Sequence, residues 1–206
     1  PWRLGAAVLH ALGRGEAIAA RFADQAGAGQ IALLLARGLN CPPTPSAGRL
    51  FDAAAALLGL CPVQRHEGEA AMRLEAVASD LCAEPWPDTW QIDADGRLTW
   101  PGLWTHLADA GDAPTAAAAF HATLVAALTD WVAHHARATG LAQVALGGGC
   151  FINRRLVNGL VAALADRGLT PLEARQAPPG DGGLALGQAA IALDHLLGAR
   201  STAGAP

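Results

Sequence analysis

Apolar residues recur at steps of three and four along most of the first 140 residues, a spacing typical of amphipathic or buried helices. A proline-rich loop at residues 40–46 interrupts this pattern, because proline lacks a backbone donor and breaks helices. Residues 1–140 are therefore expected to form a helical region. The predicted helices cover residues 4–12, 17–39, 51–60 and 113–139.

Between residues 84 and 104 the pattern changes to prolines, tryptophans and short alternating segments. Segments 89–92 and 97–100 flank the turn sequence Asp93-Ala94-Asp95-Gly96, which predicts a β-hairpin. Few basic residues accompany the tryptophans, so we interpret them as an apolar patch over a helix rather than a stacking platform for bases. We assign no chemistry to this Trp-rich hairpin, about residues 86–104.

The last third of the chain repeats a strand, glycine turn and helix pattern. The apolar run at residues 144–146 ends in Gly147, Gly148 and Gly149, and a helix follows from Asn153. A second strand at 170–175 leads through a Pro- and Gly-rich turn containing Asp181 to a helix over residues 184–197. We expect residues 141–206 to be α/β, with both strands in one open sheet and both turns at its ligand-binding edge.

These glycine turns suggest an anion site. Glycine permits sharp turns and close approach to a ligand, and the first turn of a helix offers unpaired N–H groups and a positive dipole end. A phosphate is therefore predicted at residues 147–149 and the start of the following helix. The alternatives are a purely structural turn there and a helix N-cap at Asp181.

Composition excludes several functions. All 14 basic residues are arginine, so there is no Walker lysine and no Schiff-base lysine. The net charge of −4 and the lack of a basic run argue against nucleic-acid binding. The four cysteines form no Cys-x-x-Cys pair and fit a reducing cytoplasm. Neither a signal segment nor an apolar run of membrane-spanning length is apparent, so we expect a cytoplasmic protein without a membrane partner.

Several motifs together resemble one family. Residues 147–156 and 178–188 closely resemble the carboxyl-terminal end of HypF proteins, the carbamoyltransferases that mature nickel–iron hydrogenases. Residues 1–3, 48–53 and 67–71 occur in the order that this family uses. The resemblance covers nearly the whole chain and implies an actin-like, ribonuclease-H-related α/β fold in which two lobes close over a nucleotide. This chain would be the second lobe, a fragment of a longer multidomain protein.

The resemblance also implies roles for individual residues. Asp52 would accept hydrogen bonds from ribose hydroxyls, whereas the alternative is a favourable interaction with its helix dipole. Gly68 would let the backbone approach the same nucleotide, or form a plain turn. The glycines at 147–149 would cradle an adenylate that Asn153 helps to orient. His121 is a candidate to support the site from behind, or else a satisfied core histidine.

The implied reaction uses ATP and carbamoyl phosphate to form carbamoyl-adenylate in a neighbouring domain. The carbamoyl group would then pass to the C-terminal cysteine of a hydrogenase-maturation partner, so no cysteine of this chain needs to be nucleophilic. Asp181 would be catalytic, as a ligand to a divalent metal, iron or zinc, shared with two histidines outside this chain. One carboxylate cannot hold such a metal tightly, so the isolated chain is expected to be inactive.

The sequence departs from the family pattern at several polar positions. Serine is usual where Gly147 and Pro45 stand, asparagine where Gly180 stands, and tyrosine where His66 stands. A tRNA threonylcarbamoyl transferase is one alternative, although lysine and asparagine would be expected there in place of Ala53 and Gly182. An O-carbamoyltransferase and a non-catalytic docking scaffold are the others.

Overall fold

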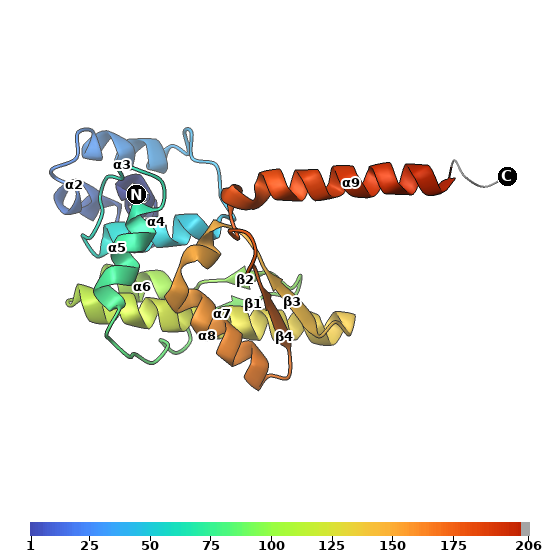
Figure 1. Ribbon diagram of the computed structural model, residues 1–206. Helices are drawn as coiled ribbons and strands as arrows, with labels where there is room; N and C mark the ends of the chain where they lie inside the picture. Colours follow the sequence, from blue (N-terminus) through green and yellow to red (C-terminus); the bar gives the residue numbers. More distant parts are fainter. Residues whose placement is uncertain (203–206) are drawn as a thin grey trace.

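The computed structural model describes the backbone of residues 1–202 and the side chains of residues 1–197. Helices dominate the first region, and α9 (Leu184–Thr202) projects away from this body (Figure 1). The helices of that region are α1 (Trp2–Ala11), α2 (Ile18–Arg21), α3 (Ala28–Ala36), α4 (Ala47–Leu57), α5 (Glu69–Ala78), α6 (Leu103–Ala108) and α7 (Ala113–Thr139).

Helix α7 is the centre of the core, because α5, α6 and α8 all pack against it. Its side chains at residues 116–121 are all buried, and the Phe120 ring meets Phe51 of α4 edge-on at 5.4 Å. Contrary to the sequence expectation, α7 is long and apolar enough to cross a membrane by length and composition. Because 61% of its most apolar window is buried within the protein, we interpret it as a core helix.

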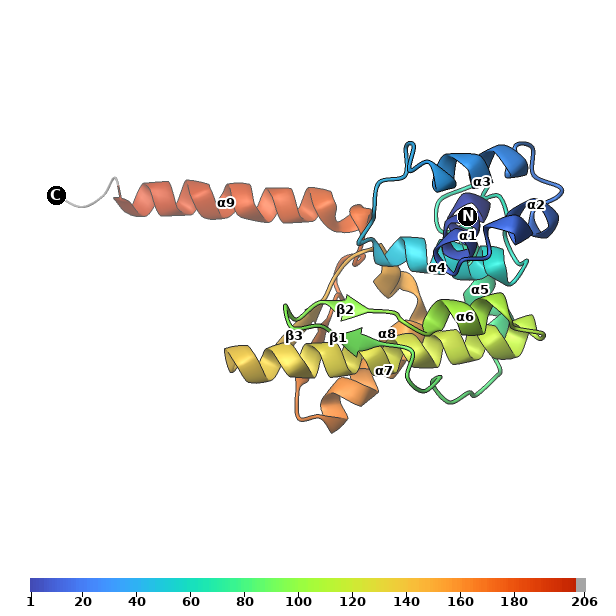
Figure 2. The same cartoon turned by 180° about the vertical axis from the view of Figure 1, so that it is seen from behind.

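The predicted hairpin is confirmed. Strands β1 (Gln91–Ile92) and β2 (Leu98–Thr99) pair antiparallel and lie beside α7 (Figure 2). Asp93 closes the turn by accepting hydrogen bonds from the backbone N–H groups of residues 95 and 97. The carbonyl of Gly96 accepts from Trp131 Nε1 at 2.8 Å, which ties the hairpin to the helix.

The single helix predicted at residues 17–39 is wrong. A 3₁₀ turn, η1 (Gly15–Ala17), leads into the short α2, and a loop then separates α2 from α3. Gly27, at the N-cap position before α3, has φ at +86°, a conformation that interrupts a continuous helix. Alanine and leucine favour helix throughout this stretch, so the periodicity did not reveal the break.

Two further helix predictions need correction. The helix expected at residue 51 begins at Ala47, so Asp52 lies in its second turn and the proposed interaction with the helix start is wrong. Helices α5 and α6 were not predicted, because they are only 10 and 6 residues long and carry few periodic positions.

The α/β end follows the predicted order. Strands β3 (Gln143–Leu146) and β4 (Thr170–Glu173) form a parallel pair, connected by α8 (Arg154–Asp166). The apolar stripe of α8 is buried, and α8 packs on α7. A Cβ on Gly159 would lie 2.7 Å from Val125 Cγ2, so glycine permits this close crossing. The helical region and the α/β end therefore share a core.

Helix α9 (Leu184–Thr202) exposes apolar side chains on all sides. It extends from the body without packing along it (Figures 1 and 2). Leu172 of β4 is also 45% exposed, although parallel sheets are normally covered on both faces. A helix that is apolar all round is normally buried in a core. The exposed apolar residues of α9 are Leu184, Leu186, Ile191, Leu193, Leu196 and Leu197.

Candidate functional site

The two glycine turns meet at one end of the parallel sheet. Each follows the carboxyl end of a strand and contains a 3₁₀ turn, η2 (Gly149–Ile152) after β3 and η3 (Asp181–Gly183) after β4. The Gly148 N–H donates to the Pro179 carbonyl at 2.6 Å. A Cβ on Gly180 would lie 3.3 Å from the Gly149 Cα, so the turns touch. The structure thus brings residues 147–149 beside the segment that carries Asp181.

The start of α8 does not offer the free anion site that the sequence predicted. The N–H groups of Arg154 and Arg155 both donate to Oε1 of Glu75, at 2.8 and 3.2 Å. The next N–H, of Leu156, donates to Oδ1 of Asn153 at 2.9 Å, and the fourth is paired within the helix. A carboxylate from α5 already occupies this helix terminus, so the prediction of a phosphate there is wrong.

The glycine turn itself remains open. Within the part of the chain that the structure describes, nothing lies within 4 Å of a Cβ built on Gly147, Gly148 or Gly149. Gly148 has φ at +112°, which restricts the position to glycine. Among the described residues, no hydrogen bond engages the N–H groups of Gly149 and Cys150. These two donors, rather than the start of α8, are available to an anion.

Asn153 is held from both ends of its amide. Its Oδ1 caps α8, and its Nδ2 lies 3.0 Å from Nε2 of His121 on α7. His121 Nδ1 lies 2.7 Å from the Ala117 carbonyl, which can only accept, so Nδ1 carries the proton and Nε2 accepts from Asn153. Burial lowers the pKa of His121, which favours this neutral form. Asn153 and His121 are 7% and 1% exposed.

Asp52 is a buried carboxylate with an incomplete set of partners. Its side chain is 6% exposed, and the Arg49 guanidinium lies 2.9 Å from Oδ2. The angles of that contact do not make a hydrogen bond, so Oδ2 is buried without one. Burying such an oxygen costs free energy, which the Arg49 charge offsets only in part. Burial, together with the Asp52 charge, raises the pKa of the nearby Cys150 thiol, which disfavours a nucleophilic thiolate.

Gly68 and Asp181 stand at the edges of this arrangement. Gly68, with φ at +75°, begins α5 and lies about 10 Å along that helix from Glu75. Asp181 is exposed as the first residue of η3, where Gly180 occupies the N-cap position. No hydrogen bond of its carboxylate appears among the described residues. The structure gives the capping alternative for Asp181 no support.

A complete metal site is absent from the part of the chain that the structure describes, where no three His, Cys, Asp or Glu side chains cluster. Asp181 offers one exposed carboxylate oxygen donor, of a kind that iron and zinc both accept. This donor fits one ligand position. The remaining ligands would have to come from outside the described residues.

Side-chain hydrogen bonds join the C-terminal half of α5 to the start of α8. Glu75 of α5 accepts from the first N–H groups of α8, and Arg155 of α8 donates to the Ala78 carbonyl at the end of α5 and to the Leu81 carbonyl beyond it. Each charge matches the dipole end that it meets. The sequence reasoning missed Glu75, because a side chain 79 residues upstream carries no local pattern that marks it as a cap.

We expect Glu75→Ala to lower the free energy of unfolding by about 1–3 kcal/mol, because two backbone donors lose a charged acceptor. Glu75→Gln keeps an acceptor and should lose less. Chemical denaturation measures the difference, with Asp95→Ala in the exposed hairpin turn as the control. A Glu75→Ala protein as stable as the control would contradict this account of how α8 is held.

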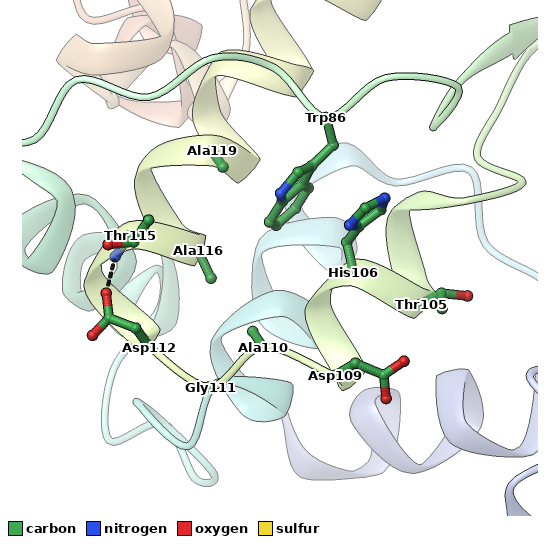
Figure 3. A pocket seen from close by; sticks show the side chains of 10 residues that line it. All are labelled: Trp86, Thr105, His106, Asp109, Ala110, Gly111, Asp112, Thr115, Ala116 and Ala119. Carbon is green, nitrogen blue, oxygen red and sulfur yellow. Dashed lines mark hydrogen bonds between the residues drawn. The ribbon is translucent and has the colours of Figure 1, made fainter.

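A cavity of about 480 Å³ lies away from this site, between α6 and the start of α7 (Figure 3). The Trp86 ring stacks on His106, with centroids 5.0 Å apart and planes 10° from parallel. Asp112 caps α7 through the Thr115 N–H, and Asp109 pairs with Arg14. Both carboxylates are therefore engaged, and the cavity holds no unpaired charge that would select a ligand.

Comparison with known proteins finds relatives of the chain among proteins named carbamoyltransferases. Residues 1–188 match the family described as "Carbamoyltransferase, Kae1-like Domain, second subdomain". The chain is 44% identical to Carbamoyltransferase HypF2 of Cupriavidus necator, over 95% of this chain and 28% of that protein. It is 46% identical to Carbamoyltransferase HypF of Rhizobium leguminosarum bv. viciae, over 96% of this chain and 26% of that protein. The chain thus spans about a quarter of the length of these relatives.

Solved structures agree in fold. Full-length HypF, solved in its phosphate- and nucleotide-bound form, superposes with a TM-score of 0.78 and 27% identity. That superposition covers 95% of this chain and 26% of the solved one. The HypF of T. kodakarensis gives a TM-score of 0.73 at 23% identity over 95% of this chain and 27% of its own, which supports the fold alone.

Proposed function

Because the chain belongs to the HypF carbamoyltransferase family, as the second subdomain of its Kae1-like domain, we propose that it forms a nucleotide-binding face of a carbamoyltransferase serving hydrogenase maturation. The two-lobed actin-like arrangement, with this chain as the second lobe, is part of the proposal. The observation that carries it is the buried Asp52, whose Oδ2 lacks a hydrogen bond, close to the open glycine turn. A cytoplasmic location is likewise proposed.

Each polar group of the site has a suitable task. Asp52 accepts hydrogen bonds from ribose hydroxyls through its carboxylate, which has acceptor capacity left over in the described structure. The free N–H groups of Gly149 and Cys150 donate to a phosphate oxygen, as open backbone turns commonly do. Asn153 retains one N–H and one lone pair beyond its two observed bonds. Gly68 allows the backbone at the start of α5 to approach the same ligand.

The proposed reaction is the transfer of a carbamoyl group. ATP, carbamoyl phosphate and water yield carbamoyl-adenylate in a neighbouring domain, with release of pyrophosphate from ATP and phosphate from carbamoyl phosphate. This chain's face binds that adenylate. The thiolate of a partner's C-terminal cysteine attacks the carbamoyl carbon, the bond from that carbon to the phosphate oxygen breaks, and AMP leaves with the electron pair. Backbone donors at the glycine turn stabilise the charge that develops on the phosphate.

Asp181 is proposed as one ligand of a divalent metal, with iron or zinc as the candidates. Its position on η3, against the glycine turn, suits a carboxylate that faces the phosphate end of the ligand. When bound, such a metal supplies Lewis-acid polarisation of an acyl phosphate. Two histidines outside this chain would complete its ligands.

The test of the function is Asp52→Asn in the full-length polypeptide. We expect nucleotide affinity to fall about 5- to 100-fold, and formation of AMP from ATP in the presence of carbamoyl phosphate to fall with it. The free energy of unfolding should change by less than about 1 kcal/mol, because the substitution removes a buried charge and only a half-exposed ion pair. Calorimetry and denaturation measure the two quantities.

Glu69 supplies a matched control, as a second buried carboxylate whose oxygens are both engaged. It accepts from the Arg65 N–H and from Arg73, and these bonds lower its pKa. Glu69→Gln should therefore destabilise the fold while nucleotide affinity is retained. Unchanged affinity in Asp52→Asn, or equal loss of affinity in both variants, would overturn the ribose assignment.

A further inference from the structure

His121 connects three elements that surround the glycine turn. It is 1% exposed on α7, its ring meets Phe51 of α4 edge-on at 5.8 Å, and Nε2 accepts from Asn153 at the start of α8. Phe51 precedes the buried Asp52 in the same helix. A single imidazole therefore bonds one candidate ligand-binding side chain, Asn153, and contacts the sequence neighbour of the other, Asp52. Its two nitrogens are both used in these contacts and in the bond to Ala117.

We propose that His121 is a positioning residue whose unprotonated Nε2 holds the Asn153 amide in the orientation that both caps α8 and shapes the glycine turn for a nucleotide. The inference rests on the proposed function for its ligand. An amide can present either its oxygen or its nitrogen to a neighbour, and only the acceptor at Nε2 selects Nδ2 for that side. With Nδ2 placed there, Oδ1 is left to face the Leu156 N–H.

Protonation of His121 would undo this selection. Nε2–H and Nδ2–H would then be two donors facing each other, so their hydrogen bond is lost or the amide turns over. A turned amide places Nδ2 against the Leu156 N–H, and the cap is lost. The charged groups around the ring are Arg155 of α8, which disfavours protonation, and Glu75 of α5, which favours it; burial outweighs both. Nucleotide affinity should therefore weaken as pH falls.

The experiment measures affinity of the full-length polypeptide for a non-hydrolysable ATP analogue by calorimetry, from about pH 8 down to the acidic side of the range in which histidine ordinarily titrates, because burial lowers the pKa of His121. Wild-type affinity is expected to fall about 3- to 30-fold towards the acidic end, the range that loss of a cap allows. His121→Gln keeps an acceptor but cannot titrate, so it should rescue binding and flatten the pH profile. His121→Leu has no acceptor and should bind weakly at every pH.

A matched control is His135→Gln on the same helix, because His135 also bonds through Nε2, to the Gly96 carbonyl in the hairpin. Its pH profile should remain that of the wild type. A His121→Gln protein that keeps the wild-type pH profile, or a His121→Leu protein that binds normally, would overturn the proposal.

A second measurement does not depend on nucleotide. In Asn153→Asp the cap is kept, but both side-chain oxygens are acceptors, so the variant should favour protonated His121. Histidine titration followed by NMR should show a higher pKa for His121 in this variant than in the wild type. If wild-type protein binds no nucleotide, the proposed function fails. The titration still tests the coupling between His121 and Asn153 in that case. An unchanged titration would overturn the coupling alone.

Discussion

Replacing Asp181 by asparagine in the full-length polypeptide is expected to abolish carbamoyl transfer to the partner cysteine and to remove most of the bound metal, while the fold survives. The reason is the lack of structural contacts at the Asp181 carboxylate. Asp181 is exposed and lies outside the N-cap position, and its carboxylate makes no hydrogen bond among the described residues, so the substitution removes no side-chain contact that stabilises the chain. It removes the negative charge that a divalent metal needs from its carboxylate ligand.

The measurements are metal content by elemental analysis, transfer to the partner cysteine by mass spectrometry and the midpoint of thermal unfolding. Asp95→Asn in the exposed hairpin serves as the control, because Asp95 is a carboxylate in a turn remote from the glycine turns. Wild-type metal content and transfer in Asp181→Asn would show that Asp181 is not a ligand. A large loss of stability would instead indicate a structural role that the described contacts do not contain.

The glycine turns were predictable because their cause is local. Residues 147–149 follow an apolar strand directly, and the parallel pairing of β3 with β4 follows from two consecutive strand–turn–helix units. The hairpin at Asp93 and the long helix α7 were predictable for the same reason, since turn residues and long periodic runs determine them. In each case the residues that determine the structure are neighbours in the sequence.

The contacts within the site were not predictable, because they join distant segments. The Glu75 carboxylate fills the start of α8 from 79 residues upstream, and His121 meets Asn153 across 32 residues. The sequence therefore predicted a phosphate at the start of α8, a position that the Glu75 carboxylate occupies in the structure. The earlier start of α4 likewise moves Asp52 into a buried second turn, where Oδ2 lacks a hydrogen bond and becomes the strongest feature of the site.

The isolated chain is expected to show no turnover of ATP with carbamoyl phosphate and to self-associate in solution. The full-length polypeptide is expected to turn over ATP and not to associate through α9. Asp181 supplies only one metal ligand, so the proposed centre is incomplete. Six large apolar side chains of α9 are 55–66% exposed, and Ile152 beside the glycine turn is 66% exposed. Apolar surface of this kind drives association when its natural cover is missing.

Light scattering and an AMP-release assay measure the two properties. Leu186→Glu and Leu193→Glu on α9 should make the isolated chain more monomeric, because a charge replaces exposed apolar surface. In the full-length polypeptide the same substitutions should destabilise the fold, since there we expect these side chains to be buried against the first lobe. Less self-association of the isolated chain together with lower stability of the full-length polypeptide would indicate that α9 is buried in the full-length polypeptide. A monomeric isolated chain that turns over ATP would refute both the division of the site between lobes and the burial of α9.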